Sequence, residues 1–572
     1  MAERRPMAGP HPKVAEALEL LRQGRMDRRD FIRIVTWLGV GAASAYALAG
    51  LPQPARAQAA LPFPADDPSA KRNGTVRIAM QVQPLEDPAT YAWVQMSNQT
   101  RHIVEYLTFT DPDNITKPML AESWTASDDL KTWTFNLRKG VLWHTGEELI
   151  SQHVRWNIER WLDPVLGSPN LGLSTFTAMI EEVDTGTKND KGLPKLEKRA
   201  IPGAVSNPDR YTIVFKLAKP VLSVPQDLYN YPCAILHPSF KPPFSDNPIG
   251  TGPFRLTELV PAERCILGRV TTTTEGKPFT YWGGDVYLDE IRYIHFDSEN
   301  QLTAIAAGST DACWEFGIDQ MEYAKSLDGV IVAARTAQTN VVRMQVDQKP
   351  FDDIRVRKAL AKSIDNAAIK AAVFPEGGDV AYNFHVAPIH PEFFELPPLQ
   401  RDVEGAKALL KEAGYETLEL SVDCGNTEGP WQQVMLEVMR EQMREVGIRL
   451  TVNVMPAAKY WEIWNQTPFG ATSWTHRPLG TMVLSLAYRT GVPWNETHYS
   501  NPAFDKALDD AEATLDTEAR KAKMELIEKT LQDDAVMLQA LWRPVYAMVS
   551  KRIRGLGAHP TGYHQLNKVW VD

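Results

Sequence analysis

The chain has 572 residues, of which 44% are apolar and 23% charged, and its formal net charge is −10. This composition is typical of a globular protein and excludes a disordered tail or an integral membrane protein. The net acidity argues against a nucleic-acid binder, because phosphate recognition needs a basic face. At about 100–200 residues per domain, the length predicts three or four domains or one large two-lobed body.

The N-terminal residues have the pattern of an export signal. Paired Arg28 and Arg29 precede an apolar run over residues 34–51, and residues 55–57 (ARA) form a small-x-small cleavage pattern. A basic start, an apolar middle and a small-residue exit are typical of a signal peptide, and the paired arginines indicate the twin-arginine route. We therefore expect residues 1–57 to be a targeting signal rather than part of the fold. The alternative is a retained membrane anchor, since the run is close to the ~20 residues that span a bilayer.

The four cysteines are Cys233, Cys265, Cys313 and Cys424. They are too few for a disulfide scaffold, and none has the C-x-x-C spacing of a zinc ribbon or a thioredoxin-type site. A protein that folds before export does so in reducing cytosol. We expect free buried thiols, with disulfide bridges as the alternative.

Strand patterns dominate the part of the chain that follows the signal. Residues 74–83, 132–137 and 210–217 alternate apolar and polar side chains, and this period of two predicts half-buried strands. Residues 184–209 are polar and interrupted by Gly and Pro, so we expect turns or a hairpin there.

Helix and strand patterns alternate in the later part. Asp353 is placed to cap a helix whose inner side carries Ile354, Val356, Leu360 and Ile364. Asp402 is placed to cap another helix, which ends at Gly414, and Asn501 precedes a third. Residues 418–424, 431–446 and 448–455 have the patterns of a strand, a helix and a strand. They predict a βαβ unit in an α/β layer.

Motifs for catalysis are absent from the sequence. There is no G-x-S-x-G and no H-E-x-x-H, and residues 275–278 (EGKP) lack the first glycine and the Ser or Thr of a phosphate loop. His144 and His153 are nine residues apart, a spacing that fits no common metal motif. We expect no enzyme, no metal site and no cofactor.

A series of sequence blocks runs through the chain: residues 118–124 (PMLAESW), 132–141 (TWTFNLRKGV), 143–146 (WHTG), 250–254 (GTGPF), 352–360 (DDIRVRKAL), 363–365 (SID), 406–414 (AKALLKEAG) and 499–505 (YSNPAFD). In this order they resemble the extracellular solute-binding proteins of family 5, which serve peptide, nickel and opine ABC importers. Each block is weak alone, and the shared order makes the resemblance specific.

The resemblance implies an α/β fold of the periplasmic binding protein type, with two lobes that close over a ligand about a hinge. The expected parts are a first lobe of residues 58–108, 210–340 and 545–572, an extra subdomain at 109–209, a second lobe at 341–544, and crossings between the lobes near 338–343 and 543–550.

The resemblance also implies a function without catalysis. The expected protein is a periplasmic receptor that captures a small solute, peptide-like or opine-like and carrying a carboxylate, and delivers it to a membrane permease and its ATPase. We expect a monomer with no nucleic-acid partner and no membrane span after export. Alternatives are a receptor for a metal chelate and a ligand-binding chaperone or sensor partner.

Ligand contacts are expected around residues 473–480. In peptide-binding relatives, a Trp followed by an Asp in this region holds the α-ammonium of the peptide. Here Trp474 is kept, and His476 and Arg477 stand where the acid is expected. A guanidinium would repel an ammonium and can bind a carboxylate through two parallel hydrogen bonds. The alternative, which we give equal weight, is that Arg477 forms a structural ion pair and does not contact the ligand.

Further contacts are expected from aromatic residues. By resemblance, Tyr91 and Trp93 lie in a loop that faces the cleft, with core packing as the alternative. Trp314 follows a Gly-x-x-Asp block that leads to the cleft. Trp494 and Asn495 come before the helix at Asn501, where Asn495 is either a ligand contact or a turn residue.

Overall fold

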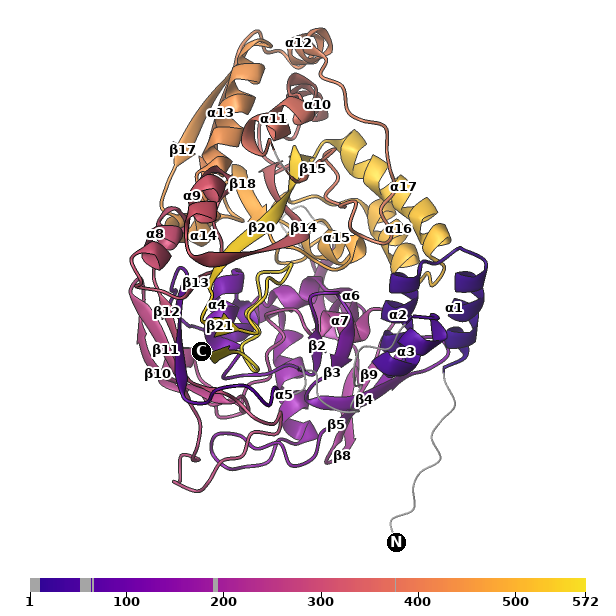
Figure 1. The fold of residues 1–572 in the computed structure, drawn as a ribbon. Coiled ribbons are helices and arrows are strands. Elements are labelled where there is room, and N and C mark those ends of the chain that lie inside the picture. Colours follow the sequence, from indigo (N-terminus) through magenta and orange to yellow (C-terminus); the bar gives the residue numbers. More distant parts are fainter. Residues whose placement is uncertain (1–10, 52–62, 64–65, 189–193, 376) are drawn as a thin grey trace.

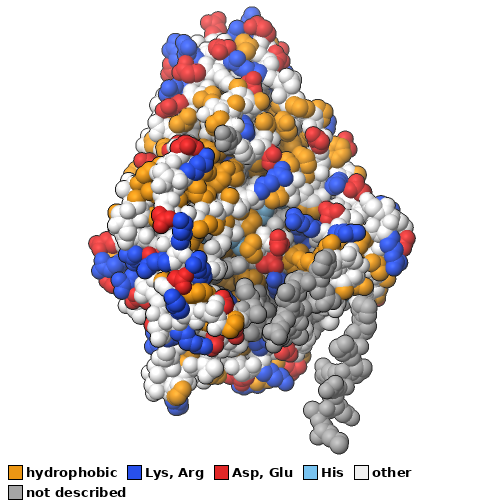
Figure 2. Space-filling view, viewed as in Figure 1, with side chains coloured by type: hydrophobic (Ala, Val, Ile, Leu, Met, Phe, Trp, Pro, Cys, Tyr) orange, Lys and Arg blue, Asp and Glu red, His pale blue; other side chains and the backbone are white. Residues whose placement is uncertain are grey.

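The structure is a computed structural model that describes residues 11–51, 63, 66–188, 194–375 and 377–572. Two lobes lie one above the other in Figure 1, and three N-terminal helices lie at their side. In Figure 2, both acidic and basic side chains are spread over the visible face.

One mixed sheet runs through both lobes, in the order β10-β11-β12-β1-β13-β20-β14-β18-β16-β17. Its first-lobe strands are β1 (Gly74–Ala79), β10 (Phe254–Val260), β11 (Arg264–Arg269), β12 (Leu288–Ile294) and β13 (Ala312–Cys313). Val76 and Ile78 of β1 are fully buried, which confirms the strand predicted from alternation.

Two long strands connect the lobes. β14 (Gly329–Met344) and β20 (Leu541–Ser550) pair antiparallel, and their register shifts midway along β14. Beyond this shift β14 pairs with β18 (Phe469–Trp474) of the second lobe. β14 and β20 contain residues 338–343 and 543–550, where the crossings between the lobes are expected.

The second lobe contains the predicted βαβ unit. β16 (Leu418–Cys424) and β17 (Ile448–Val454) pair in parallel, joined by α13 (Trp431–Arg444). Met435 and Met439 lie four residues apart on the buried side of α13 and pack on this sheet. The apolar periodicity that predicted the unit therefore describes its core.

The predicted helix caps are present. Asp353 caps α10 (Ile354–Ser363), Asp402 caps α12 (Val403–Glu412) and Asn501 caps α16 (Pro502–Glu512). Ile354, however, is 38% exposed and does not face the core. The reason is that two helical residues turn the chain through about 200°, which places Ile354 opposite the buried Val356.

A second sheet forms the extra subdomain. Its strands are β4 (Ala121–Ala126), β5 (Thr132–Leu137), β9 (Thr212–Lys216) and β8 (Val205–Asp209), in that order and antiparallel. α5 (Ser151–Trp161) packs beside it, and β6 (Ile180–Lys188) and β7 (Pro194–Ala200) form a hairpin. β9 lies beyond residue 209, so this sheet extends past the boundary expected from the sequence.

The other elements used below and in Figure 1 are α4 (Val94–Thr100), β2 (Thr108–Thr110), β3 (Thr116–Pro118), α6 (Ser174–Thr177), α7 (Val224–Asp227), α8 (Gln301–Ala306), α9 (Met321–Ser326), α11 (Asn366–Val373), β15 (Asp379–Val380), α14 (Ala457–Ile463), α15 (Gly480–Ala487), α17 (Thr517–Asp534), β19 (Met537–Leu538), β21 (Ile553–Arg554) and β22 (Trp570–Val571).

Three helices within residues 11–51 pack on the folded body, contrary to the expectation that residues 1–57 are a targeting signal rather than part of the fold. Its helices are α1 (Pro12–Arg22), α2 (Arg28–Trp37) and α3 (Ala42–Leu48). Phe31 and Ile34 in α2 have no exposed surface, whereas Arg28 and Arg29 are exposed. The stretch that has the sequence pattern of a signal peptide thus also packs on the lobes as an amphipathic helix.

All four cysteines are buried and unpaired. Burial raises the pKa of the Cys265 thiol to about 12, so it stays protonated near neutral pH. In the part of the chain that the structure describes, no helix combines the length and apolarity needed to cross a membrane.

Candidate solute-binding site

A cavity with aromatic walls lies between the lobes; about 380 Å³ of it is free of protein atoms, a volume that includes space open to solvent. It is lined by Ala92, Trp93, Val94, Tyr231, Glu428, Trp461, Trp464, Thr472, Ser473, Trp474, Thr475, Arg477 and Trp494. Residues 92–94 and Tyr231 come from the first lobe, and the others come from the second. Closure of the lobes therefore encloses this space.

Ring contacts join the two lobes across the cavity. The centroid of Trp93 lies 5.9 Å from that of Trp461, and the centroid of Tyr231 lies 5.7 Å from that of Trp494. Trp474 meets Trp494 edge to face at 5.8 Å. Such walls suit a ligand with an apolar or planar part, which they bury at little cost in side-chain entropy.

Arg477 brings a positive charge into this aromatic surrounding. Arg477 is only 3% exposed. Its guanidinium carbon lies 5.5 Å from the ring centre of Tyr231 and 5.8 Å from that of Trp494. Nη1 donates 2.6 Å to the hydroxyl of Thr475, and Nε has no hydrogen-bond partner. No carboxylate of the described residues forms an ion pair with Arg477. The structural ion pair that was the alternative is therefore not seen within the described part of the chain.

Trp474 is held by a buried network behind the cavity. Its Nε1 donates 2.7 Å to Oε1 of Glu496, and Oε2 of Glu496 accepts from Nε of Arg343 at 2.7 Å. Thr472 donates to the same Oε2 at 2.6 Å. Because Arg343 and Glu496 are almost fully buried, the network orients the indole and holds its face toward the cavity.

His476 lies in an adjoining cavity of about 280 Å³, together with Arg477 and Asn114. Its Nδ1 accepts a 3.0 Å hydrogen bond from the backbone N–H of Ala337. Burial, with the nearby charges of other histidines and arginines, lowers the pKa of His476 well below its usual value. The imidazole is therefore neutral near pH 7 and supplies no second positive charge to a ligand.

The remaining expected site residues divide into two groups. Trp93 and Trp494 line the aromatic cavity, whereas Tyr91, Trp314 and Asn495 do not. Tyr91 is buried in the core, and Trp314 donates its Nε1 to the carbonyl of Gly562 beside a different cavity.

Asn495 is a turn residue, which was the alternative to a ligand contact. Its Nδ2 donates to the carbonyls of Arg489 and Tyr499 at 3.0 and 2.7 Å. The amide is thus committed to the loop before α16.

Sequence reasoning missed Glu428, Tyr231, Trp461 and Trp464, which also line the cavity. Trp461 and Trp464 are three residues apart, the spacing of one helix face, and this pattern offered a signal. Glu428 and Tyr231 gave no such signal, because only folding brings them to the cavity that Arg477 lines.

Glu428 belongs to a buried group of charges at the cavity wall. Its Oε2 accepts from Nη2 of Arg543 at 2.8 Å, and the same Nη2 donates 3.0 Å to Oε2 of Glu315. Burial, with the charge of Glu428, raises the pKa of Glu315, and the charge of Arg543 opposes this rise. One guanidinium thus pairs with two carboxylates, one from each lobe, whereas Arg477 has no carboxylate partner among the described residues.

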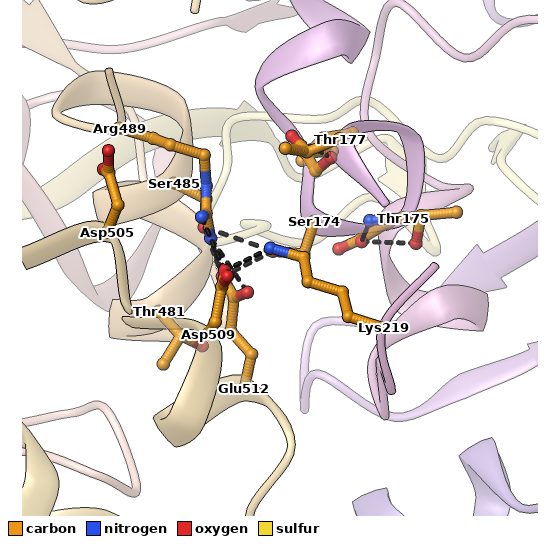
Figure 3. A network of polar contacts seen from close by, with 12 residues as sticks. Ser174, Thr175, Thr177, Lys219, Thr481, Ser485, Arg489, Asp505, Asp509 and Glu512 are labelled. Atoms are coloured by element: carbon orange, nitrogen blue, oxygen red, sulfur yellow. Dashed lines mark hydrogen bonds and ion pairs between the residues drawn. The ribbon is translucent and has the colours of Figure 1, made fainter. Parts of the chain in front are cut away.

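A polar network closes the lobes away from the cavity (Figure 3). Ser174, from the extra subdomain, donates to Oε1 of Glu512 and lies 3.1 Å from the hydroxyl of Ser485. Arg489 binds both oxygens of Glu512, at 3.1 and 2.9 Å. Lys219 forms an ion pair with Asp509 across the same boundary between the lobes, which is called the seam below. The structure is therefore a closed form.

Within the described residues, no three His, Cys, Asp or Glu side chains are grouped as a metal site would require. A two-lobed α/β body with hinge strands and an enclosed aromatic cavity defines a ligand-binding protein of the periplasmic binding protein fold.

The sequence model of the bacterial extracellular solute-binding proteins, family 5 Middle, matches residues 116–507, and the chain belongs to this family. It is a solute-binding protein and not an enzyme. The chain is 24% identical over 504 residues to the dipeptide-binding protein DppE of Bacillus subtilis, covering 84% of this chain and 88% of DppE. It is 26% identical over 499 residues to the periplasmic oligopeptide-binding protein OppA of Escherichia coli, covering 83% and 86%.

Solved structures share the fold. The periplasmic binding protein DppA from Helicobacter pylori, in complex with the peptide STSA, matches with a TM-score of 0.75 at 19% identity, covering 88% of this chain and 98% of its own. The binding protein AgaA of A. tumefaciens, in complex with agropinic acid, matches with a TM-score of 0.74 at 19% identity, covering 87% and 99%.

Proposed function

We propose that this protein captures a small organic acid, with a carboxylate on Arg477 and an apolar or planar part against Trp474 and Trp494. The observation that carries the proposal is the buried guanidinium of Arg477, which lines the cavity and has no carboxylate partner among the described residues. A buried charge is costly unless it is paired, so a ligand carboxylate supplies what the cavity lacks.

Peptides and opines both fit this chemistry in part. DppA of H. pylori holds a peptide, and AgaA holds agropinic acid. In this chain, Arg477 disfavours a ligand whose main anchor is a free ammonium, which supports an opine-like acid over an oligopeptide. Trp93, Trp474 and Trp494 are the aromatic contacts of this proposal, and His476 borders it from the adjoining cavity.

The proposed mechanism is ligand-stabilised closure about β14 and β20. A ligand that contacts both lobes binds the closed form more tightly than the open form and shifts the population toward it. The wall residues from both lobes, such as Tyr231 and Trp494, make this coupling possible.

The setting of the proposal is the periplasm. Residues 1–57 are proposed to direct export by the twin-arginine route, as Arg28 and Arg29 suggest. The exported protein acts as a monomer and delivers its solute to the permease and ATPase subunits of an ABC importer. Support for this partnership comes from the H. pylori relative, which is described as ABC transporter-associated.

Mass spectrometry of small molecules released from the purified protein tests the ligand class. We expect a compound with a carboxylate and an apolar or planar group, retained by the wild type and lost from Arg477→Ala. A released compound that is cationic, or one retained equally by both proteins, would overturn the assignment.

A further inference from the structure

The helix α2 lies across the seam between the two lobes. At its start, Asp30 accepts hydrogen bonds from Nη2 of Arg520, at 2.8 Å, and from the hydroxyl of Thr517, both in α17 of the second lobe. The side chain of Asp30 is fully buried, and the charges of Arg520 and Arg33 help to lower its pKa. This end of α2 is therefore tied to the second lobe by a buried ion pair.

The other end of α2 is tied to the extra subdomain. Nε1 of Trp37 donates 3.2 Å to the hydroxyl of Thr116, and the carbonyl of Trp37 accepts 2.7 Å from Nε1 of Trp124. Gly39 follows with φ +88°, and a Cβ there would lie 2.6 Å from the carbonyl oxygen of Trp124. A single ten-residue helix thus bridges α17 above and β3 and β4 below (Figure 1).

The same helix also borders a cavity that shares a wall residue with the cavity of His476 and Arg477. Asp30 and Arg33 line this cavity, which is partly open to solvent, together with Asn114. Asn114 also lines the cavity that holds His476 and Arg477, and Arg477 lines the aromatic cavity. The segment therefore lies near the cavities of the site as well as across the lobes.

We propose that residues 27–40 are an intramolecular clasp, a segment of this chain that binds both closed lobes and keeps the cleft shut while it stays attached. The complementary charges of Asp30 and Arg520, together with the full burial of Phe31 and Ile34, identify this segment as the occupant of the seam. Removal of the segment would leave Arg520 without its carboxylate and free the lobes to open. A chain that carries the clasp is thereby kept from taking up solutes before export.

The test uses the full chain with a protease site placed at residues 54–57, cut after purification. We expect the N-terminal fragment to stay with the body on size exclusion. In Asp30→Asn, and independently in Trp37→Ala, it should dissociate at least about 30-fold faster, because a buried partner is lost. The matched control is Arg28→Gln, an exposed residue of the same helix, which should retain the fragment as the wild type does. Immediate loss of the wild-type fragment, or equal retention in all variants, would overturn the proposal.

A second readout follows the lobes themselves in the uncut chain. X-ray scattering should give a larger radius of gyration for Asp30→Asn than for the wild type and Arg28→Gln. Iodide should quench tryptophan fluorescence more strongly in Asp30→Asn, because the cavity tryptophans become accessible. Equal radii and equal quenching would show that α2 packs on the body without holding the cleft closed. Both readouts work without a known ligand, so they are independent of the proposed ligand class.

Discussion

Trp474 and Glu496 are joined by a 2.7 Å hydrogen bond between the indole Nε1 and carboxylate Oε1, and Glu496 is itself ion-paired with Arg343. The indole that forms one wall of the cavity is thus positioned by a charge pair in the core of the second lobe. Site geometry and lobe stability are therefore coupled at this point.

Glu496→Gln should destabilise the second lobe by roughly 3–5 kcal/mol, because it leaves the guanidinium of Arg343 buried without a countercharge. Urea unfolding measures the change. Glu441→Gln, at a side chain that is 57% exposed, is the control and should change stability by less than about 0.5 kcal/mol. A loss below about 1 kcal/mol in Glu496→Gln would contradict the structural role of the pair.

Arg477→Ala should weaken ligand binding by roughly 2–5 kcal/mol, since a ligand carboxylate would be left buried and unpaired. Arg477→Lys should recover part of this loss, because an ammonium keeps the charge but lacks the planar fork. Calorimetric titration with the compound released from the wild type measures both. Arg444→Ala, on the exposed surface of α13, is the control. Undiminished affinity in Arg477→Ala would refute the assignment.

Glu528 makes stability depend on pH. Burial, with the charge of Glu392, raises the pKa of Glu528 to about 9, against about 4.3 in an unfolded chain. The folded protein therefore holds this proton more tightly, so its stabilising contribution is complete below pH 4 and is lost as pH rises toward 9. The free energy of unfolding of Glu528→Gln should therefore rise relative to that of the wild type by up to about 1.4 kcal/mol for each pH unit between these two pKa values.

Unfolding midpoints at pH 5, 7 and 9 measure this difference, with Glu525→Gln on the exposed side of the same helix as control. A difference between Glu528→Gln and wild type that stays constant across these pH values would show that Glu528 is already ionised in the folded protein.

The network in Figure 3 should hold the lobes together. Ser174→Ala with Lys219→Ala removes two contacts to Glu512 and Asp509, each worth about 0.5–1.5 kcal/mol. The double variant should show a larger radius of gyration in scattering. Lys506→Ala removes an exposed ion pair within α16 and should leave the radius unchanged. An unchanged radius in both would place the closing contacts elsewhere.

Export by the folded-protein route should depend on the paired arginines. Arg28→Lys combined with Arg29→Lys keeps both charges but removes the guanidinium groups that a receptor reads. The double variant should accumulate in the cytoplasm, measured by cell fractionation and blotting. Normal accumulation outside the inner membrane would exclude the twin-arginine route.

Local patterns determined much of the architecture. Alternation predicted β1 and β5, caps at Asp353 and Asp402 predicted α10 and α12, and their succession predicted the βαβ unit. These elements depend on interactions between residues that are close in sequence, and a periodic pattern records such interactions directly. Ile354 shows the limit of the pattern, because its apolar side chain faces outward.

The site depended on contacts that no local pattern contains. The sequence indicated Trp474, Arg477, Trp93 and Trp494, all of which line the cavity, but it did not reveal Glu428 or Tyr231. Arg477 lies 246 residues after Tyr231 in the chain, and only lobe closure brings its guanidinium 5.5 Å from that ring. The burial of α2 could not be predicted for the same reason. An apolar run determines that a helix has a side to bury away from water. Only the tertiary structure decides whether that side is buried in a membrane, in a receptor or between the lobes beside Arg520.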